Sequence, residues 1–488
     1  MKKIAGLVVI LAVLVLGGYY GMGIATERAV KHNLDAINKS NGLSVKVAEY
    51  KRKWFSSTAL LDWRLQVPER IAKSEDGQSV TVPAQEFEMQ MPMVIHHGPV
   101  IFVNNTVKFG FGYAETQIPL PAKYNEQFDS MFTSESVKPQ LNLSMFVNYF
   151  NNSQIEMSVP SFKLMGKQGQ QFDWKGMTSF LDVGSDASKV KGEFNVEGML
   201  FSKDGMKAQV GEINTDYDLQ KSDAGLYLGD ANASIPSLLV SQKDEKLFEL
   251  TDFDVHSSCN VENGLFGSQF KMSIDKVFAT GKSYGPGNLE MAIKNLDADV
   301  LARINQQVNQ AQNGTEAERQ QAMLAILPEV PKLFGRGAEF EISELSFVMP
   351  QGTVEGTLQV SLPAGDTANP FELMQKIKGN GKLKIPAEVI KLALNESNKQ
   401  KILSNQTTSQ PADQTTVADA IVSATSPAPA ATTDAVQQAA TMSDEQINAM
   451  VQSGLIAQDS NYYVIDVSLD QGSFTVNGKP FNAAMLKF

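Results

Sequence analysis

The chain has 488 residues, a formal net charge of −12, and 42% hydrophobic and 20% charged residues. Single cores stop growing near about 250–300 residues, so we expect either several domains or a body that extends in one direction. The acidic balance argues against nucleic acid as a partner, because phosphate backbones are anionic. The single cysteine, Cys259, excludes an internal disulfide.

The first segment of the chain reads as a membrane anchor. The run from Ile4 to Ala25 holds 22 uncharged residues, which as a helix would span about 33 Å, enough for a hydrocarbon core of about 30 Å. Lys2 and Lys3 precede the run and favour a cytoplasmic N-terminus. The alternative is a cleaved signal peptide, but no clean cleavage site follows. We predict an N-terminal signal-anchor transmembrane helix over residues 1–25.

Residues 26–403 are predicted to form a strand-rich body. Runs such as Phe87 to Met91 and Phe270 to Ile274 alternate apolar and polar residues, which is typical of strands with one apolar face. Turn pairs such as Asp204-Gly205 and Asn263-Gly264 separate the runs, and short connections favour antiparallel pairing. Helical spacing predicts helices at 25–41, 297–312, 315–328 and 386–394.

The C-terminal part divides into a linker and a tail. Residues 404–441 are dominated by Ala, Thr, Ser, Gln and Pro, a composition that buries too little apolar surface to fold, so we predict a disordered linker. In residues 442–488, Ser443 and Gln446 have the spacing of a helix N-terminus, and two strands follow. Because this tail is too small for a core of its own, we expect it to dock on the body.

Three segments together resemble the YdgA-like family of Gram-negative inner-membrane-anchored periplasmic proteins of unknown function. Tyr50 to Ser57 is similar to the family's early Y-x-R-G-W-F-S-S pattern, although Lys53 stands where the family has glycine. Ile95 to Pro99 is similar to its H-G-P segment, and Gly472 to Pro480 to its C-terminal N-G-K segment. The resemblance further implies a distant relation to AsmA-like envelope proteins, with long twisted sheets and an apolar face.

The predicted fold class is mainly β with some α (α+β): a transmembrane helix followed by an elongated, mostly antiparallel twisted sheet. The chain carries no glycine-rich phosphate loop, no G-x-S-x-G elbow, and no H-E-x-x-H or C-x-x-C pattern. Its four histidines are too scattered to suggest a zinc site. We therefore expect no enzyme activity, no catalytic residues, no cofactor and no metal.

The candidate functional or structural positions are those of the three motifs, namely Trp54, Phe55, His97, Gly98, Pro99, Asn477 and Gly478. His97 can be read as a general base or partner contact. The favoured interpretation is structural: a turn in which glycine supplies freedom and His97 bonds a backbone carbonyl. Trp54 and Phe55 can anchor a partner or lipid, or straddle a sheet with one ring in the core.

The functional hypothesis is a non-enzymatic inner-membrane protein, single-pass, with a cytoplasmic N-terminus and most of the chain in the periplasm. Its 20 methionines and 26 phenylalanines suit either an ordinary core or a groove for acyl chains. The first hypothesis is lipid handling or envelope homeostasis through an apolar groove. The alternative is a scaffold or assembly factor for other envelope proteins. Expected partners are the inner membrane, lipid acyl chains, other envelope proteins or a second copy of the chain, and not nucleic acid.

Overall fold

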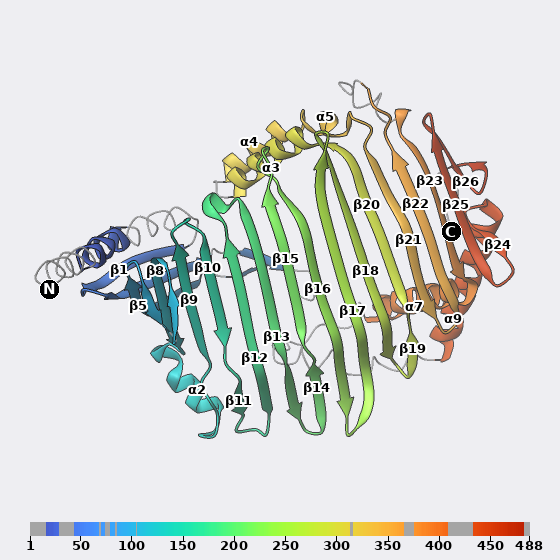
Figure 1. The fold of residues 1–488 in the computed structure, drawn as a ribbon. Coiled ribbons are helices and arrows are strands. Elements are labelled where there is room, and N and C mark those ends of the chain that lie inside the picture. The colour runs from blue at the N-terminus through green and yellow to red at the C-terminus, as the bar shows by residue number, and fades with distance from the viewer. Residues whose placement is uncertain are drawn as a thin grey trace, which may run out of the picture. The chain divides into compact units, whose positions relative to one another are not determined.

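The computed structural model describes residues 16–28, 43–67, 70–73, 79–82, 85–103, 105–312, 316–365, 375–407 and 433–482. Over these residues the protein is mainly β, with antiparallel strands and some helices (Figure 1), which confirms the predicted fold class in that respect. The chain divides into two compact units. Unit 1 comprises Met1–Val261, Phe278–Gly281 and Asp299–Leu327, and unit 2 comprises Glu262–Val277, Lys282–Ala298 and Pro328–Phe488.

Unit 1 is an antiparallel sheet in which each long strand pairs with the next long strand of the chain, while the short strands β11 and β14 extend it at one end (Figure 1). Its strands are β1 (Leu43–Arg52), β2 (Ser56–Val67), β5 (Gln85–His97), β8 (Gly110–Pro119), β9 (Gln140–Asn148), β10 (Ser153–Val159), β11 (Phe162–Met165), β12 (Gln171–Val183), β13 (Lys189–Lys203), β14 (Met206–Val210), β15 (Ile213–Lys221), β16 (Tyr227–Gln242) and β17 (Glu245–Glu262). Two separate hairpins are β3 (Arg70–Lys73) with β4 (Ser79–Val82), and β6 (Ile101–Val103) with β7 (Thr106–Lys108).

The closed core of unit 1 lies where its first strands meet. Val45, Leu61, Met91, Ile95 and Ile118, from β1, β2, β5 and β8, are each at most 7% exposed and form one cluster. A second cluster joins the β6–β7 hairpin to β8. These alternating apolar residues are on one face of their strands, as the period of two predicts, and β1, β2, β5 and β8 bury the middle of that face.

Unit 2 is also an antiparallel meander. Its strands are β18 (Leu265–Ala279), β19 (Lys282–Tyr284), β20 (Gly287–Asp297), β21 (Glu339–Met349), β22 (Gly352–Ser361), β23 (Lys378–Pro386), β24 (Ala457–Asp459), β25 (Tyr462–Asp470), β26 (Ser473–Val476) and β27 (Lys479–Pro480). The C-terminal tail joins this sheet, because β25 pairs with β23 from Pro386↔Tyr462 to Gly379↔Leu469.

The described helices are residues 16–28, α2 (Asn125–Met131), α3 (Ala298–Gln312), α4 (Glu316–Ile326), α5 (Val330–Phe334), α7 (Ala387–Thr407) and α9 (Thr433–Ser453), with short 3-10 turns at Ala122–Tyr124 and Ser185–Ala187. No helix among these residues is both long enough and apolar enough to cross a membrane. Residues 1–15 of the predicted anchor and residues 29–42 lie outside the described residues. The transmembrane helix therefore stays a prediction.

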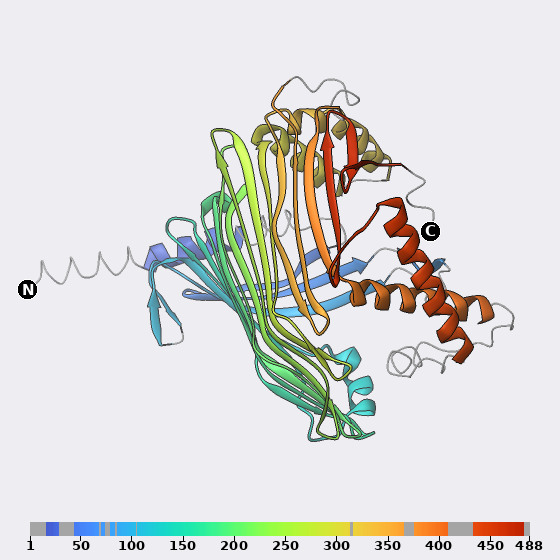
Figure 2. The same ribbon diagram turned by 90° about the vertical axis from the view of Figure 1, so that its right-hand side faces the viewer.

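The predicted disordered linker, 404–441, needs correction at both ends. α7 continues to Thr407 and α9 begins at Thr433, so 404–407 and 433–441 are helical, while 408–432 lie outside the described residues. The physical reason is that α9 packs across α7 (Figure 2) through small residues. Ala435 and Ala439 are 2% and 1% exposed, so alanines that bury little area alone are buried by a neighbouring helix.

Ser443 and Gln446 are not at a helix N-terminus, contrary to the prediction, because they lie in the middle of α9. Asn398 of α7 donates hydrogen bonds from Nδ2 to Ser443 Oγ (3.0 Å) and Gln446 Oε1 (2.9 Å). Asn398 and Ser443 are 1% and 0% exposed. A buried amide that is satisfied by the facing helix fixes the register of the two helices.

Candidate functional site

One face of the unit 1 sheet is apolar along most of its strands. Directly opposed residues form rows across neighbouring strands because the register is regular. One of these rows runs through Met145, Ile155, Leu181, Gly192, Tyr217 and Ala231. A second runs through Leu143, Met157, Ser179, Phe194, Thr215, Ala233 and Val255, and Ser179 and Thr215 are its polar members. We call this surface the apolar face of unit 1.

The apolar face of unit 2 has the same construction. Opposed side chains form rows from β18 across β20 and β21 to β22 and β23, and these rows contain Phe270, Met291, Ile342 and Leu358, and Met272, Leu289, Leu345 and Leu383. All of these side chains are intermediate in exposure. The period-two pattern therefore produces an apolar face that is neither fully buried nor fully exposed.

The apolar faces lack the closed core of the first strands. In the continuously described stretch 119–295, Val196 and Leu226 are the only hydrophobic residues that are fully buried. A sheet normally buries its apolar face against a second layer of helices or strands. Here more than ten strands leave that face partly accessible, and large accessible apolar surfaces are typical of binding sites.

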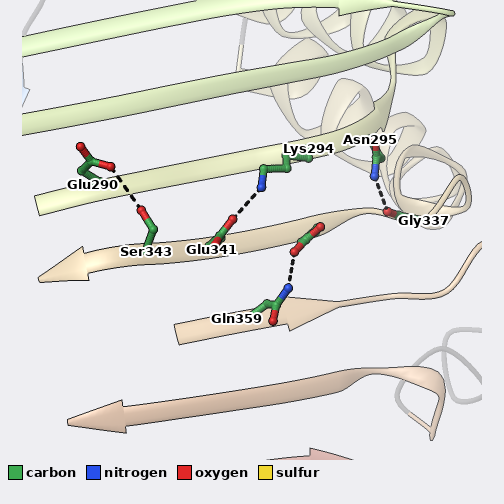
Figure 3. Close-up of polar contacts among 8 residues, drawn as sticks. Glu290, Lys294, Asn295, Gly337, Glu341, Ser343 and Gln359 are labelled. Carbon is green, nitrogen blue, oxygen red and sulfur yellow. Dashed lines mark hydrogen bonds and ion pairs between the residues drawn. The ribbon is translucent and has the colours of Figure 1, made fainter. Parts of the chain in front are cut away.

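The opposite face of each sheet is polar. In unit 2, Lys294 Nζ lies 2.6 Å from Glu341 Oε2, Asn295 donates to the Gly337 carbonyl at 3.1 Å, Ser343 donates to Glu290, and Gln359 donates to Glu339 (Figure 3). The hydrogen bond from Lys271 lowers the pKa of Glu290. Exposed pairs of this kind contribute little stability. We therefore interpret this polar face as the side of the sheet that faces solvent.

A hollow of about 1180 Å³ opens on the polar side of unit 1, over strands from β2 to β13. Its lining mixes apolar residues such as Leu60 and Val94 with the carboxylates Glu115, Glu156 and Glu193. The three glutamates share one row of the polar face, because Glu115 and Glu156 both oppose Ser144, and Phe180 opposes Glu156 and Glu193. An acidic lining of this kind repels anionic head groups.

The structure brings the first two motifs together against the N-terminal helix of residues 16–28. The Phe55 ring packs edge-on against Tyr19, with ring centroids 4.8 Å apart, and the Trp54 ring lies 5.6 Å from Tyr20. Arg52 pairs with Glu27 at 3.0 Å. Neither Trp54 nor Phe55 faces the core, since they are 56% and 53% exposed, so the expectation that the pair straddles the sheet is wrong.

His97 and Gly98 contact this helix, at Gly23 and Tyr19 respectively. His97 is 0% exposed, and a Cβ added to Gly23 would lie 2.7 Å from His97 Cε1. Gly98 has φ +132°, and a Cβ there would overlap the Tyr19 ring. Tyr19 donates to the Val100 carbonyl at 2.5 Å, and Tyr149 to the Pro99 carbonyl at 2.6 Å. Close approach without a Cβ explains both glycines.

The environment of His97 favours its neutral form. Burial lowers its pKa most, and the positive charge of Arg52 and the neighbouring His96 add to this effect, while nearby backbone groups of Ser56 and Tyr19 oppose it. Neither ring nitrogen makes a hydrogen bond of good geometry with the described residues, so the expected bond to a carbonyl is absent. In this structure His97 is a fully buried packing residue.

The third motif is hydrogen-bonded to the C-terminal end of α9 in unit 2. Asn477 and Gly478 have φ +49° and +73°, the left-handed pair that a tight hairpin turn requires. Asn477 Nδ2 donates to the carbonyls of Gly454 and Leu455 (3.1 and 3.2 Å), just beyond the end of α9, and its Oδ1 accepts from the Asp466 N–H at 2.9 Å. The side chain therefore joins the C-terminus of α9 to β25.

Sequence reasoning found the motif residues but missed their partners. Tyr19 and Gly23 fall inside the run interpreted as a membrane anchor, where Tyr19 suits the membrane interface and Gly23 suggests no partner. Their spacing of four residues, which places both on one side of a helix, is the signal that was available. Asn398 of α7 carries no local signal, because its partners lie more than 40 residues away.

No cluster of three or more His, Cys, Asp and Glu side chains in the described part of the chain is arranged to hold a metal ion. The fold and these sites define an antiparallel-sheet protein whose helices pack against turns of the sheet and whose apolar face is partly accessible. Residues 1–484 match a family of bacterial proteins of unknown function, DUF945, and the chain belongs to that family. Among curated proteins, no sequence matches the chain.

Proposed function

We propose that this protein is a non-enzymatic envelope protein that binds lipid acyl chains on its apolar face. In this proposal the uncharged run within residues 1–25 anchors it in the inner membrane, the end of that run from Tyr19 to Gly23 packs on the first strands of unit 1, and most of the chain lies in the periplasm. The uncharged run from Ile4 to Ala25 supports the anchor. The YdgA-like motifs, and the more distant likeness to AsmA-like proteins, support an envelope location and lipid handling.

The observation that carries the proposal is the shortage of buried hydrophobic residues in the stretch 119–295, where Val196 and Leu226 alone are fully buried. A water-exposed apolar surface costs about 25 cal/mol per Å². A ligand that covers the surface removes this cost, and acyl chains match it because they need no polar partners. Flexible methionines such as Met145 and Met157 adapt to chains of varied shape.

A crosslinking experiment on the full-length protein in cells tests the proposal. Phe194 lies on the apolar face, and Phe180 on the adjacent strand lies on the polar face, because Phe194 opposes Ser179 and Phe180 opposes Glu193. Both are intermediate in exposure. A photoreactive amino acid at position 194 is expected to form adducts with phospholipid or another lipid, and the same amino acid at position 180 is the matched control.

The alternative function, a scaffold for other envelope proteins, uses the same observation, since an apolar protein surface can also cover this face. Protein adducts at position 194 without lipid adducts would favour the scaffold. Equal lipid labelling at positions 180 and 194 would contradict face-specific lipid binding. Labelling at neither position would contradict both functions.

A further inference from the structure

Six aromatic side chains of unit 1 stand out by their exposure. Trp54, Phe55, Phe102, Phe109, Phe111 and Phe150 are 56%, 53%, 70%, 61%, 45% and 81% exposed, in that order. Scattered exposed apolar residues need no explanation, but large rings gathered from separate chain segments do. These six belong to the β1–β2 turn, the β6–β7 hairpin, the start of β8 and the β9–β10 turn. We call them the aromatic collar.

Contacts hold these segments together around the N-terminal helix. Tyr19 and Tyr20 of the helix touch Phe55 and Trp54. The Tyr19 hydroxyl donates a hydrogen bond to the carbonyl of Val100, which directly precedes the hairpin that carries Phe102.

On the other side of the same loop, Tyr149 connects two further segments. Its hydroxyl bonds the Pro99 carbonyl, and its ring lies 5.5 Å from Phe111. Phe150, the most exposed member of the collar, follows Tyr149 in the chain. These contacts connect the chain segments that carry the collar residues, so the six rings do not belong to unrelated loops.

Cationic side chains lie beside the collar. Arg52, which is paired with Glu27, lies 5.1 Å from the centre of the Tyr20 ring. Lys108, directly before Phe109, lies 4.9 Å from the ring of Phe146 behind the collar. Lys53, beside Trp54, is exposed. Tryptophan and tyrosine rings mixed with lysine and arginine are typical of the boundary between lipid and water, where the amphipathic rings lie at the level of the head groups and the cations meet phosphate. Phenylalanine rings have no polar group, so those of the collar would reach the acyl side of that boundary.

We propose that the aromatic collar rests in the head-group layer of a phospholipid bilayer, and that it sets the orientation of unit 1 on the membrane. The occupant is a lipid surface and not a protein, because Trp54 and Phe55 of the collar contact a helix whose preceding residues, from Ile4 onward, are uncharged. A chain that enters the bilayer there brings the collar to the same surface. This inference rests on the proposed membrane attachment.

Tryptophan fluorescence of the full-length protein in vesicles tests the collar. The chain has three tryptophans, so the double substitution Trp63→Phe with Trp174→Phe leaves Trp54 as the only reporter. The vesicles contain phosphatidylcholine and phosphatidylglycerol with brominated acyl chains, which quench on contact. Trp54 emission is expected to shift to the blue and to be quenched. Trp54→Phe with Trp174→Phe leaves Trp63, which is partly buried against the closed core, and its emission is expected to be quenched less than that of Trp54.

A second reporter separates the collar from the helix alone. Phe150→Trp, in a chain whose three native tryptophans are replaced by phenylalanine, reports the far side of the collar, and its emission is also expected to be quenched. Flotation with vesicles but no quenching at one or both positions overturns the collar and leaves membrane attachment standing. Failure to float with vesicles overturns the attachment and the collar together.

Discussion

The substitution Asn477→Ala tests whether the C-terminal motif is structural. It removes three side-chain hydrogen bonds, to Gly454, Leu455 and Asp466, each worth about 1 kcal/mol net. It also places a residue without a local polar side chain at φ +49°, which costs roughly 1 kcal/mol more. We expect a loss of about 3–4 kcal/mol of local stability, because the α9 terminus and β25 lose their connection.

Hydrogen exchange followed by mass spectrometry measures this loss where it occurs. Protection of peptides from α9 and β25 is expected to fall by at least roughly 100-fold, since about 1.4 kcal/mol corresponds to a factor of ten. The matched control is Asn263→Ala, because Asn263 also has a positive φ, +53°, before a glycine, and its side chain is exposed. Equal losses in the two variants would refute the role assigned to the Asn477 side chain.

Three further predictions concern the helix contacts. Gly23→Leu is expected to displace the helix of residues 16–28, because even a Cβ there meets His97 at 2.7 Å, and exchange protection of those residues should be lost while β12 keeps its own. The pKa of His97 is lowered while the helix is docked, so the state with the helix undocked takes up a proton first as the pH falls below 6.5, and the docking equilibrium should weaken by up to about tenfold per pH unit. His97→Gln should remove this pH dependence of docking. An unchanged pH dependence in that variant would contradict the role given to His97. Asn398→Ala leaves Ser443 and Gln446 without their donor and should cost about 1–3 kcal/mol of α7–α9 stability in denaturant titration; no measurable loss would show that the helices do not depend on this bond.

Strand positions were predictable from local sequence, because alternation is a local property. Phe270 to Ile274 lies in β18, and Asp204 and Asn263 both have the positive φ that their turn pairs predict. Each of these features depends on neighbours within a few residues. The period of two also indicates which side chains share a face, and so it predicts the apolar face in outline.

Long-range helix contacts were not predictable in this way. The N-terminal helix packs on the sheet through a contact between Gly23 and His97, which are more than 70 residues apart in the sequence. Alternation at Ile95 to His97 predicts a buried ring but not its neighbour. The start of α9 was missed because Ala435 and Ala439 supply little hydrophobic area unless α7 is beside them.

The meander topology of unit 1 has a consequence for how the chain folds. The closed core uses residues between Val45 and Ile118, so it can form before later strands have been synthesised. Each later strand, from β9 to β17, then finds its partner already in place and closes only a short loop. When hairpins are added one after another, only the last strand added presents a new unpaired edge. This shortens the time during which apolar strands can aggregate.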